Sequence, residues 1–390
     1  MNPLSITGYS CDMHVDNGIL LVREWVFEDN KGKEHLVRLK PKQHTYDSII
    51  LHTDKGNISL SAMQWLNRYN IPIVMLDLKG NIIMQTQNNN VNAELRIKQV
   101  KGYNDPKTRI GIGKEIIKAK IQRQSDTLDY LANRYGIDNS LNPDKVMSAK
   151  SQKEILGLEG IASNNYWAQI SKIVKGFQRD NGFTHRPMNA VDPFNASLNY
   201  GYGMLAGIVR NELNGIGLDT HIGFVHEIGQ GKEPLVYDMQ EPYRFLVDLT
   251  AIRCYENSMF DKQDFIHNRD WIVSLSESGI DKMLRELQLT FNTRAKYHGK
   301  EWKWDNIIGM KARELANGLD SCNIDFSMPK LEIKRNDNKE LRDRISKIKY
   351  SDWAKLGYSK GTLHYLKHNL DSLSFKVYEP VLRKLEEIAK

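Results

Sequence analysis

The sequence predicts an α+β protein with several domains: a small N-terminal β-rich domain, a larger all-α domain and a short C-terminal helical domain. Short β-branched runs separated by Asn, Asp and Gly dominate residues 1–88. Residues 89–325 instead place apolar side chains at helical spacing. Residues 326–390 combine a polar stretch with two short helical patterns, and a chain of 390 residues can supply a separate core for each part.

The N-terminal domain is expected to be mainly strands, which the sequence places at 18–27, 34–39, 48–52, 71–76 and 80–84. Residues 61–69 have a helical pattern and interrupt them. The polar stretch at 87–92 is typical of a loop, so we place the end of this domain at about residue 88.

The helical domain opens with a basic amphipathic segment at 111–124. Its cations are Lys114, Lys118, Lys120 and Arg123. A solvated helix face is the simplest interpretation. In a protein that binds DNA the same residues become candidate phosphate contacts, each weak but adding to a salt-dependent total.

The C-terminal segment carries most of the excess positive charge. Residues 331–390 hold 14 Lys and Arg against 9 Asp and Glu, so they contribute +5 to a net charge of +7. Residues 334–340 are typical of a linker. A short helix from Tyr350 is expected to end at Gly357, and Ser359 can cap a second helix from Lys360 to about Asn369 that faces Leu363 inward.

Helix, tight glycine turn and helix is the arrangement of a helix-turn-helix, whose second helix enters the major groove of DNA. An ordinary basic helical hairpin docked on the main body is the alternative. The candidate DNA-reading residues are Ser359, Lys360, Thr362, His364, Lys367 and His368.

A candidate metal site combines one imidazole with several carboxylates. His226 lies 67 residues after Glu159, and Asp238 and Glu241 follow it. On a helix, Asp238 and Glu241 would share one face at about 5–6 Å between Cβ atoms, close enough to support one ion. Such residues can hold a divalent cation beside a phosphodiester. Each also has a simpler interpretation: an acidic pair is favoured in a first helical turn, and a lone histidine is more often packed than ligating.

Composition limits the location and the partners of the protein. Three widely separated cysteines, Cys11, Cys254 and Cys322, argue against a disulfide framework and for a reducing compartment. No segment predicts a membrane span and the N-terminus does not have the pattern of a signal peptide, so we expect a cytoplasmic protein. A pI near 9.0 favours a polyanionic partner such as nucleic acid.

Four blocks in order resemble the integrase of CRISPR adaptation and its transposon-encoded relatives, the casposases. The first is Leu158-Glu159-Gly160, followed by Tyr166-Trp167. The second contains His185-Arg186-Pro187 and the segment 192–202. The third is Gly223-Phe224-Val225-His226, and the fourth is the segment 235–244, from Leu235 to Arg244. The resemblance extends to about residue 320, and the C-terminal segment is most similar to the helix-turn-helix of casposases.

This resemblance implies that Glu159, His226 and Glu241 bind the metal, with Asp238 as a supporting or alternative ligand. Mg²⁺ or Mn²⁺ is the expected ion, because carboxylate-rich sites suit these hard cations. It also implies that the N-terminal domain forms a homodimer. Arg186 is interpreted as a phosphate contact, Arg244 as a residue that orients a carboxylate or clamps the attacked phosphate, and Asn195 as a helix N-cap.

The expected function is metal-dependent joining of donor DNA 3′-hydroxyl ends to target duplex DNA by transesterification, as in a casposase, with endonuclease activity when water replaces the hydroxyl. One alternative is a CRISPR adaptation integrase that inserts spacers together with a partner adaptation protein. The other is a DNA-binding regulator without catalysis, against which the intact set Glu159, His226, Asp238 and Glu241 argues.

Overall fold

The computed structural model of the chain divides into two compact units. One contains Met1–Ala251 and Lys262–Leu331, and the other contains Ile252–Asp261 and Glu332–Lys390. The described residues are 2–28, 31–41, 43, 45–77, 82–86, 92–174, 190–267, 272–319, 324–329, 349–355 and 357–369.

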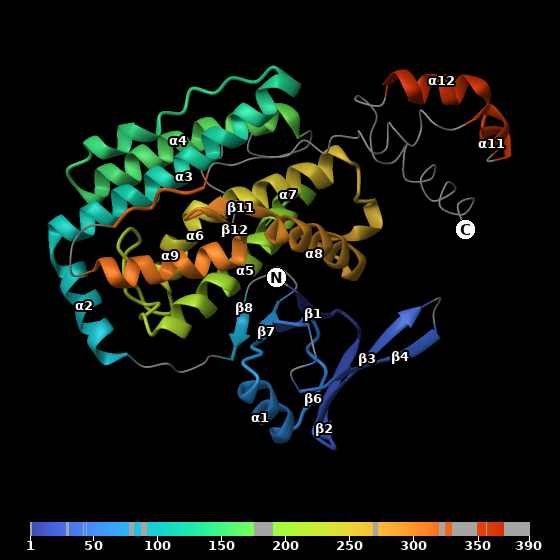
Figure 1. Ribbon diagram of the computed structural model, residues 1–390, viewed down its shortest axis with the longest axis horizontal. Helices are drawn as coiled ribbons and strands as arrows, with labels where there is room; N and C mark the ends of the chain where they lie inside the picture. The colour runs from blue at the N-terminus through green and yellow to red at the C-terminus, as the bar shows by residue number, and fades with distance from the viewer. Residues whose placement is uncertain are drawn as a thin grey trace. The chain divides into compact units, whose positions relative to one another are not determined.

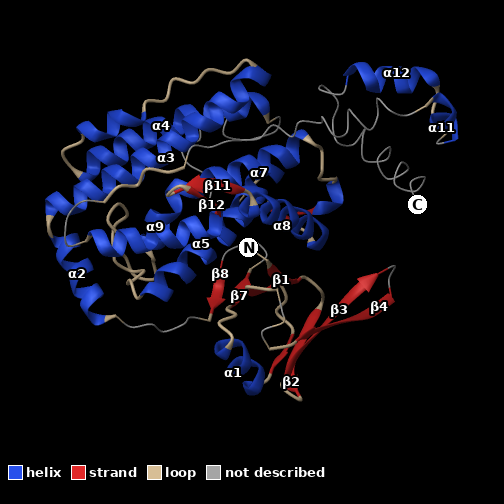
Figure 2. Ribbon diagram, viewed as in Figure 1, coloured by secondary structure: helices blue, strands red, loops and turns tan. Residues whose placement is uncertain are grey.

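Two four-stranded sheets and one helix form the N-terminal part of the larger unit (Figures 1 and 2). In the first sheet, with the order β1-β5-β7-β8, only β8 runs antiparallel to its neighbour. In the second, with the order β4-β3-β2-β6, the first three strands are antiparallel and β6 is parallel to β2. The bounds are β1 Pro3–Ile6, β2 Ser10–Asp16, β3 Ile19–Glu28, β4 Lys31–Leu39, β5 Ser48–Leu51, β6 Gly56–Ile58, α1 Leu60–Arg68, β7 Ile73–Leu76 and β8 Ile82–Gln85.

Both sheets and α1 bury their apolar side chains in one shared core. Ile6 and Ile49 from the first sheet, Leu20 and Val22 from the second and Leu66 from α1 are almost fully buried. Leu20 and Val22 are two positions apart in β3, and both face this core because alternate residues of a strand face the same side. The β-rich N-terminal region that the sequence predicts is confirmed.

Beyond residue 92 the larger unit is mainly helical, as predicted, but the expectation of an all-α domain is wrong, because this part also contains the strands β9 to β12. The 30-residue helix α3 begins after Asp105, whose carboxylate accepts a hydrogen bond from Thr108 N, and ends at Gly136 in the left-handed conformation. Helix α4 packs along α3, and α5 to α7 follow. The bounds are α2 Ala93–Asn104, α3 Pro106–Tyr135, the 3₁₀ turn η1 Pro143–Ser148, α4 Gln152–Ile173, α5 Pro193–Ile216, α6 Pro234–Gln240, the 3₁₀ turn η3 Glu241–Tyr243 and α7 Arg244–Glu256.

Two short antiparallel hairpins accompany the last helices of this unit. Strands β9 and β10 form one, and β11 and β12 form the other. The bounds are η4 Lys262–Asp264, β9 Phe265–His267, β10 Val273–Leu275, α8 Glu277–Asn292, β11 Arg294–Tyr297, β12 Lys300–Lys303 and α9 Trp304–Gly318.

In the smaller unit, α11 (Tyr350–Lys355) and α12 (Lys360–Asn369) flank a turn. Gly357 in this turn has φ +78°, and Ser359 Oγ accepts a hydrogen bond from Thr362 N at 3.1 Å. Trp353 and Leu363 are fully buried. These elements occur where the sequence places them, whereas a DNA-reading helix-turn-helix remains a prediction.

The N-cap of α5 corrects one prediction. Asp192 caps this helix, because its Oδ1 accepts a hydrogen bond from Asn195 N at 2.8 Å. Asn195 is the third helical residue, and its amide donates to Asp192 Oδ2 at 2.6 Å. The signal for the correct cap is Pro193, since proline is favoured at the first helical position directly after the cap.

Two further predictions concern cysteines and membranes. Cys11 is a buried free thiol, Cys254 is also buried, and Cys322 lies outside the described residues. Among the described helices, none is both long enough and apolar enough to span a membrane.

Candidate active site

His226 is held by Asp238, which projects from α6 toward the preceding loop. Asp238 Oδ2 accepts hydrogen bonds from the backbone N–H groups of Phe224 and Val225, the latter at 2.9 Å. Asp238 Oδ1 accepts from His226 N at 2.9 Å and from His226 Nδ1 at 2.7 Å. Because an ionised carboxylate only accepts, the ring hydrogen is on Nδ1, and Nε2 is left for a ligand.

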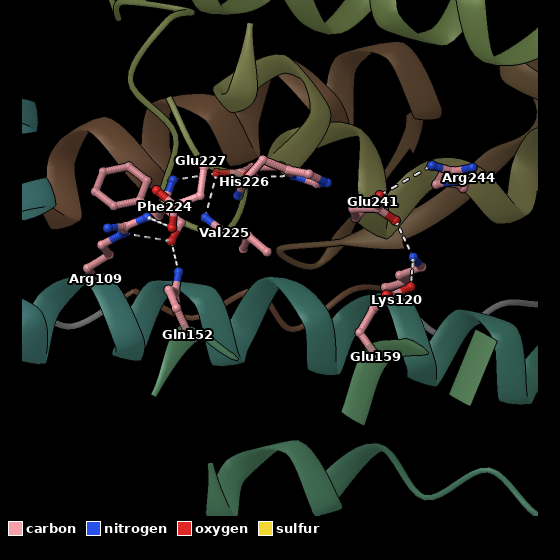
Figure 3. A network of polar contacts seen from close by, with 11 residues as sticks. Arg109, Lys120, Gln152, Glu159, Phe224, Val225, His226, Glu227, Glu241 and Arg244 are labelled. Atoms are coloured by element: carbon pink, nitrogen blue, oxygen red, sulfur yellow. Dashed lines mark hydrogen bonds and ion pairs between the residues drawn. The ribbon is translucent and has the colours of Figure 1, made fainter. Parts of the chain in front are cut away.

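Two long helices hold the same loop from the other side. Arg109 of α3 and Gln152 of α4 both donate to the Phe224 carbonyl, and Arg109 also pairs with Glu227 at 3.0 Å (Figure 3). Gly223 is required at the start of the loop, since a Cβ there would lie 2.8 Å from Asp238 Oδ2. The position of His226 is therefore set by α3, α4 and α6 together.

Lys120 joins the two glutamates that the sequence singles out. Its ammonium contacts Glu159 Oε1 and lies 2.7 Å from Glu241 Oε2 (Figure 3). The three side chains come from α3, α4 and η3 and are 9 %, 21 % and 6 % exposed in that order. Ser163, one turn after Glu159, donates to Glu159 Oε1 at 2.6 Å.

The charge of Glu241 is stabilised despite its burial. Burial by itself raises the pKa of this carboxyl, but Lys120, Arg244 and His226 outweigh burial and lower the pKa to about 2. Arg244 Nη1 donates to Glu241 Oε1 at 3.2 Å, and its guanidinium lies 4.1 Å from the centre of the Tyr202 ring. Glu241 is thus a buried anion between two cations.

A buried carboxylate lies behind this group. Asp248 of α7 accepts hydrogen bonds from the hydroxyls of Tyr202 and Tyr166, the latter at 3.0 Å. Burial raises the pKa of Asp248, and the two tyrosines and Arg244 act in the opposite direction. Tyr166 also packs edge-on against Trp167, so the paired aromatics after Glu159 are part of the support beneath the site.

Two carboxylates, Asp238 and Glu241, act on the charge of the His226 ring, and Lys120 acts against them. Burial favours the neutral ring, but the hydrogen bond to Asp238 and the charges of Asp238 and Glu241 prevail, and the pKa of His226 is raised.

The structure brings Glu159 and Glu241 together and gives Asp238 a separate place. Asp238 contacts the 224–226 loop rather than the point at which the two glutamates meet. Within the part of the chain that is described, no three His, Cys, Asp or Glu side chains gather as closely as a complete metal site requires. Lys120, which the sequence suggests only as a helix-face cation, lies between the glutamates instead.

The residues present nevertheless fit a divalent cation. Glu159 and Glu241 already converge on one positive centre, the Lys120 ammonium. Glu241 Oε2 is buried, and among the described residues it finds this ion-pair partner without a well-directed hydrogen bond. Two carboxylates and an imidazole with a free Nε2 form a donor set that suits Mg²⁺ or Mn²⁺.

The candidate DNA contacts on α3 differ in their burial and in their partners. Lys118 pairs with Asp144 at 2.8 Å, whereas Lys114 is half-buried on the same helix. Arg123 is buried and donates to the carbonyl of Pro329 at 2.6 Å, which makes it a structural residue. Lys120 contacts Glu159 and Glu241.

The other candidate contacts lie elsewhere. His185 and Arg186 are outside the described residues. On α12, Ser359, Lys360 and His364 are exposed and Thr362 is half-buried, whereas the side chain of Lys367 is outside the described part.

Residues 4–289 match the family model for the CRISPR associated protein Cas1. The chain belongs to the Cas1 family. It is 28 % identical over 339 residues to a CRISPR-associated endonuclease Cas1 of Archaeoglobus fulgidus, which covers 80 % of this chain and 95 % of the relative.

Solved structures give the same family and add one informative neighbour. A casposase bound to its integration product aligns with a TM-score of 0.80 and 34 % identity, covering 90 % of this chain and all of the other. A Cas1 protein from Thermotoga maritima aligns with a TM-score of 0.65 and 17 % identity over 84 % of this chain, and supports the fold alone. The comparisons thus place the chain among Cas1 proteins, and its relatives include an endonuclease and a casposase.

Proposed function

We propose that the protein is a divalent-metal-dependent DNA integrase of the casposase type. The observation that carries the proposal is the convergence of Glu159 and Glu241 on one cationic point beside an imidazole oriented by Asp238. The 34 % identity to a casposase, over nearly the whole chain, supports the transposon branch.

Glu159, Glu241 and His226 Nε2 are the groups that would hold the cation. When bound there, a divalent cation supplies charge stabilisation to the attacked phosphate and lowers the pKa of an attacking hydroxyl. Asp238 keeps the His226 tautomer and ring direction constant, which is a positioning role rather than ligation.

The proposed reaction is strand transfer. The 3′-oxygen of a donor end forms a bond to a target phosphorus, the bond from that phosphorus to the target 3′-oxygen breaks, the donor hydroxyl proton leaves to solvent and the released 3′-oxygen takes one up. Arg244, fixed by Glu241 and the Tyr202 ring, is placed to neutralise phosphate charge during this exchange.

The protein has to hold donor and target duplexes at one site. We therefore propose that it acts as a homodimer or larger assembly through the β-rich N-terminal region, with residues 1–88, 89–325 and 326–390 as its domains. In this proposal α11 and α12 form a DNA-reading helix-turn-helix. A cytoplasmic location follows from action on DNA.

A CRISPR adaptation integrase with a partner adaptation protein is the second candidate. The Cas1 relatives support it, including the Archaeoglobus fulgidus protein. The casposase alignment covers 90 % of the chain, whereas the Cas1 family model matches only residues 4–289, and this difference favours the first candidate.

The test is strand transfer of a labelled oligonucleotide into supercoiled plasmid with Mg²⁺ or Mn²⁺. Wild-type protein should give joined product, and Glu159→Ala and His226→Ala should abolish it while DNA binding persists. Binding without joining by the wild-type protein, with every donor offered, would support the non-catalytic regulator instead.

A further inference from the structure

The hairpin of β11 and β12 is drawn across the middle of the helical part of the larger unit (Figure 1). Its register pairs Arg294 with Lys303 and Lys296 with Glu301. His298 and Gly299 at its tip both have positive φ, +48° and +77°, as a two-residue hairpin turn of the tightest type requires. Side chains on this ribbon therefore have fixed positions.

The hairpin has one anchored face and one free face. On the anchored face, Tyr297 is buried and donates to both carboxylate oxygens of Glu314, at 2.6 and 2.8 Å. The register and the alternation of side chains place the opposite set together. We call this set the basic hairpin face, and it consists of Arg294, Lys296, Glu301 and Lys303.

The basic hairpin face carries a net positive charge. It has three cations and one carboxylate, and Arg294 and Lys296 are exposed. Within the described residues, none of its three cations forms an ion pair. Arg294 and Lys303 are directly opposite each other, and like charges in this arrangement destabilise a sheet pair. A polyanion bound to this face would remove that repulsion.

The hairpin is also tied to the candidate active site. Trp304, directly after β12, packs edge-on against Phe245 with 5.2 Å between ring centres. Phe245 directly follows Arg244, the residue that pairs with Glu241. An anion held by the hairpin is thereby held in a constant relation to Arg244 and Glu241.

We propose that the basic hairpin face binds the phosphate backbone of duplex DNA. The inference rests on the proposed integrase function and names the surface that holds a duplex beside the site. A two-stranded ribbon is narrow enough to follow a DNA groove, and fixed cations along it contact phosphates without reading sequence.

The test measures binding of a short labelled duplex by the full-length protein across a salt series. The variant is Arg294→Ala/Lys296→Ala. The matched control is Lys40→Ala/Arg68→Ala, which removes the same charge from exposed positions of the N-terminal region. Each lost phosphate contact reduces the steepness of the fall of log K with log salt by about 0.9. The slope of the hairpin variant should therefore be smaller in magnitude by about 2. The control should lose less than half as much.

Two further readouts separate the possible outcomes. The hairpin variant should keep or slightly raise its melting temperature, because the repulsion between Arg294 and Lys303 is gone. An unchanged salt slope, or a loss matched by the control, overturns the proposal, as does a change in oligomeric mass without a change in DNA affinity. Failure of strand transfer in the wild-type protein would refute the integrase function, and the salt slopes would still decide the role of the hairpin.

Discussion

Lys120→Met offers the strongest test of the site, because it removes one positive charge and keeps most of the apolar side chain. The ammonium lies between two carboxylates, 2.7 Å from Glu241 Oε2, and its side chain is 9 % exposed. Removing one member of a buried ion pair costs about 3–5 kcal/mol. Arg244 still compensates Glu241, and Glu159 is partly exposed, so we expect the lower end, about 3 kcal/mol.

The assay is thermal unfolding by circular dichroism, first with EDTA and then with Mn²⁺. Each kcal/mol lost from the free energy of unfolding lowers the melting temperature of a large domain by about 2–4 °C. Lys120→Met should therefore melt about 6–12 °C below the wild type in EDTA. Millimolar Mn²⁺ should recover much of this loss, because a bound cation replaces the missing charge. Mn²⁺ should raise the melting temperature of the wild type by less.

Lys118→Met is the matched control. Lys118 lies on the same helix, but its partner Asp144 is 77 % exposed, so this pair is worth at most about 1 kcal/mol. The reasoning is refuted if Lys120→Met and Lys118→Met melt alike in EDTA, or if Mn²⁺ stabilises Lys120→Met no more than it stabilises the wild type.

Three other predictions address the surroundings of the site. Asp238→Asn should reduce strand transfer about 10–100-fold, since an amide cannot accept all the hydrogen bonds that orient His226, and full activity in this variant would contradict the positioning role. Asp248→Asn should lower the free energy of unfolding by about 1–3 kcal/mol in urea titrations by weakening the bond from Tyr202, an effect that Tyr202→Phe should partly reproduce. Burial lowers the pKa of His52 from 6.5 to about 4, so the stability that its neutral ring contributes is complete above pH 6.5 and is lost as the pH falls toward 4. His52→Gln should make the melting temperature less dependent on pH over that range. A variant with the same pH dependence as the wild type would show that His52 does not contribute this stability.

The main regions of the fold could be predicted because they depend on local patterns. Alternating apolar residues such as Leu20 and Val22 predict strands, and helical periodicity predicts the region beyond residue 92. Gly357 and Ser359 likewise predict the ends of two helices from the conformations and hydrogen bonds that these residue types favour. Where two residues can perform the same local task, as Asp192 and Asn195 can at the start of α5, residue type alone leads to the wrong choice.

By itself, the sequence determined that a β-rich region precedes a mainly helical one, and it singled out Glu159, His226, Asp238 and Glu241 as residues of types that can bind a metal. Only the tertiary structure decided their roles. Asp238 and Glu241 are three residues apart, yet α6 ends between them. Asp238 orients His226, whereas Glu241 shares the Lys120 ammonium with Glu159. Lys120 reaches both glutamates only because α3 packs against α4 and η3. Contacts between segments distant in the chain depend on packing, which no local pattern encodes.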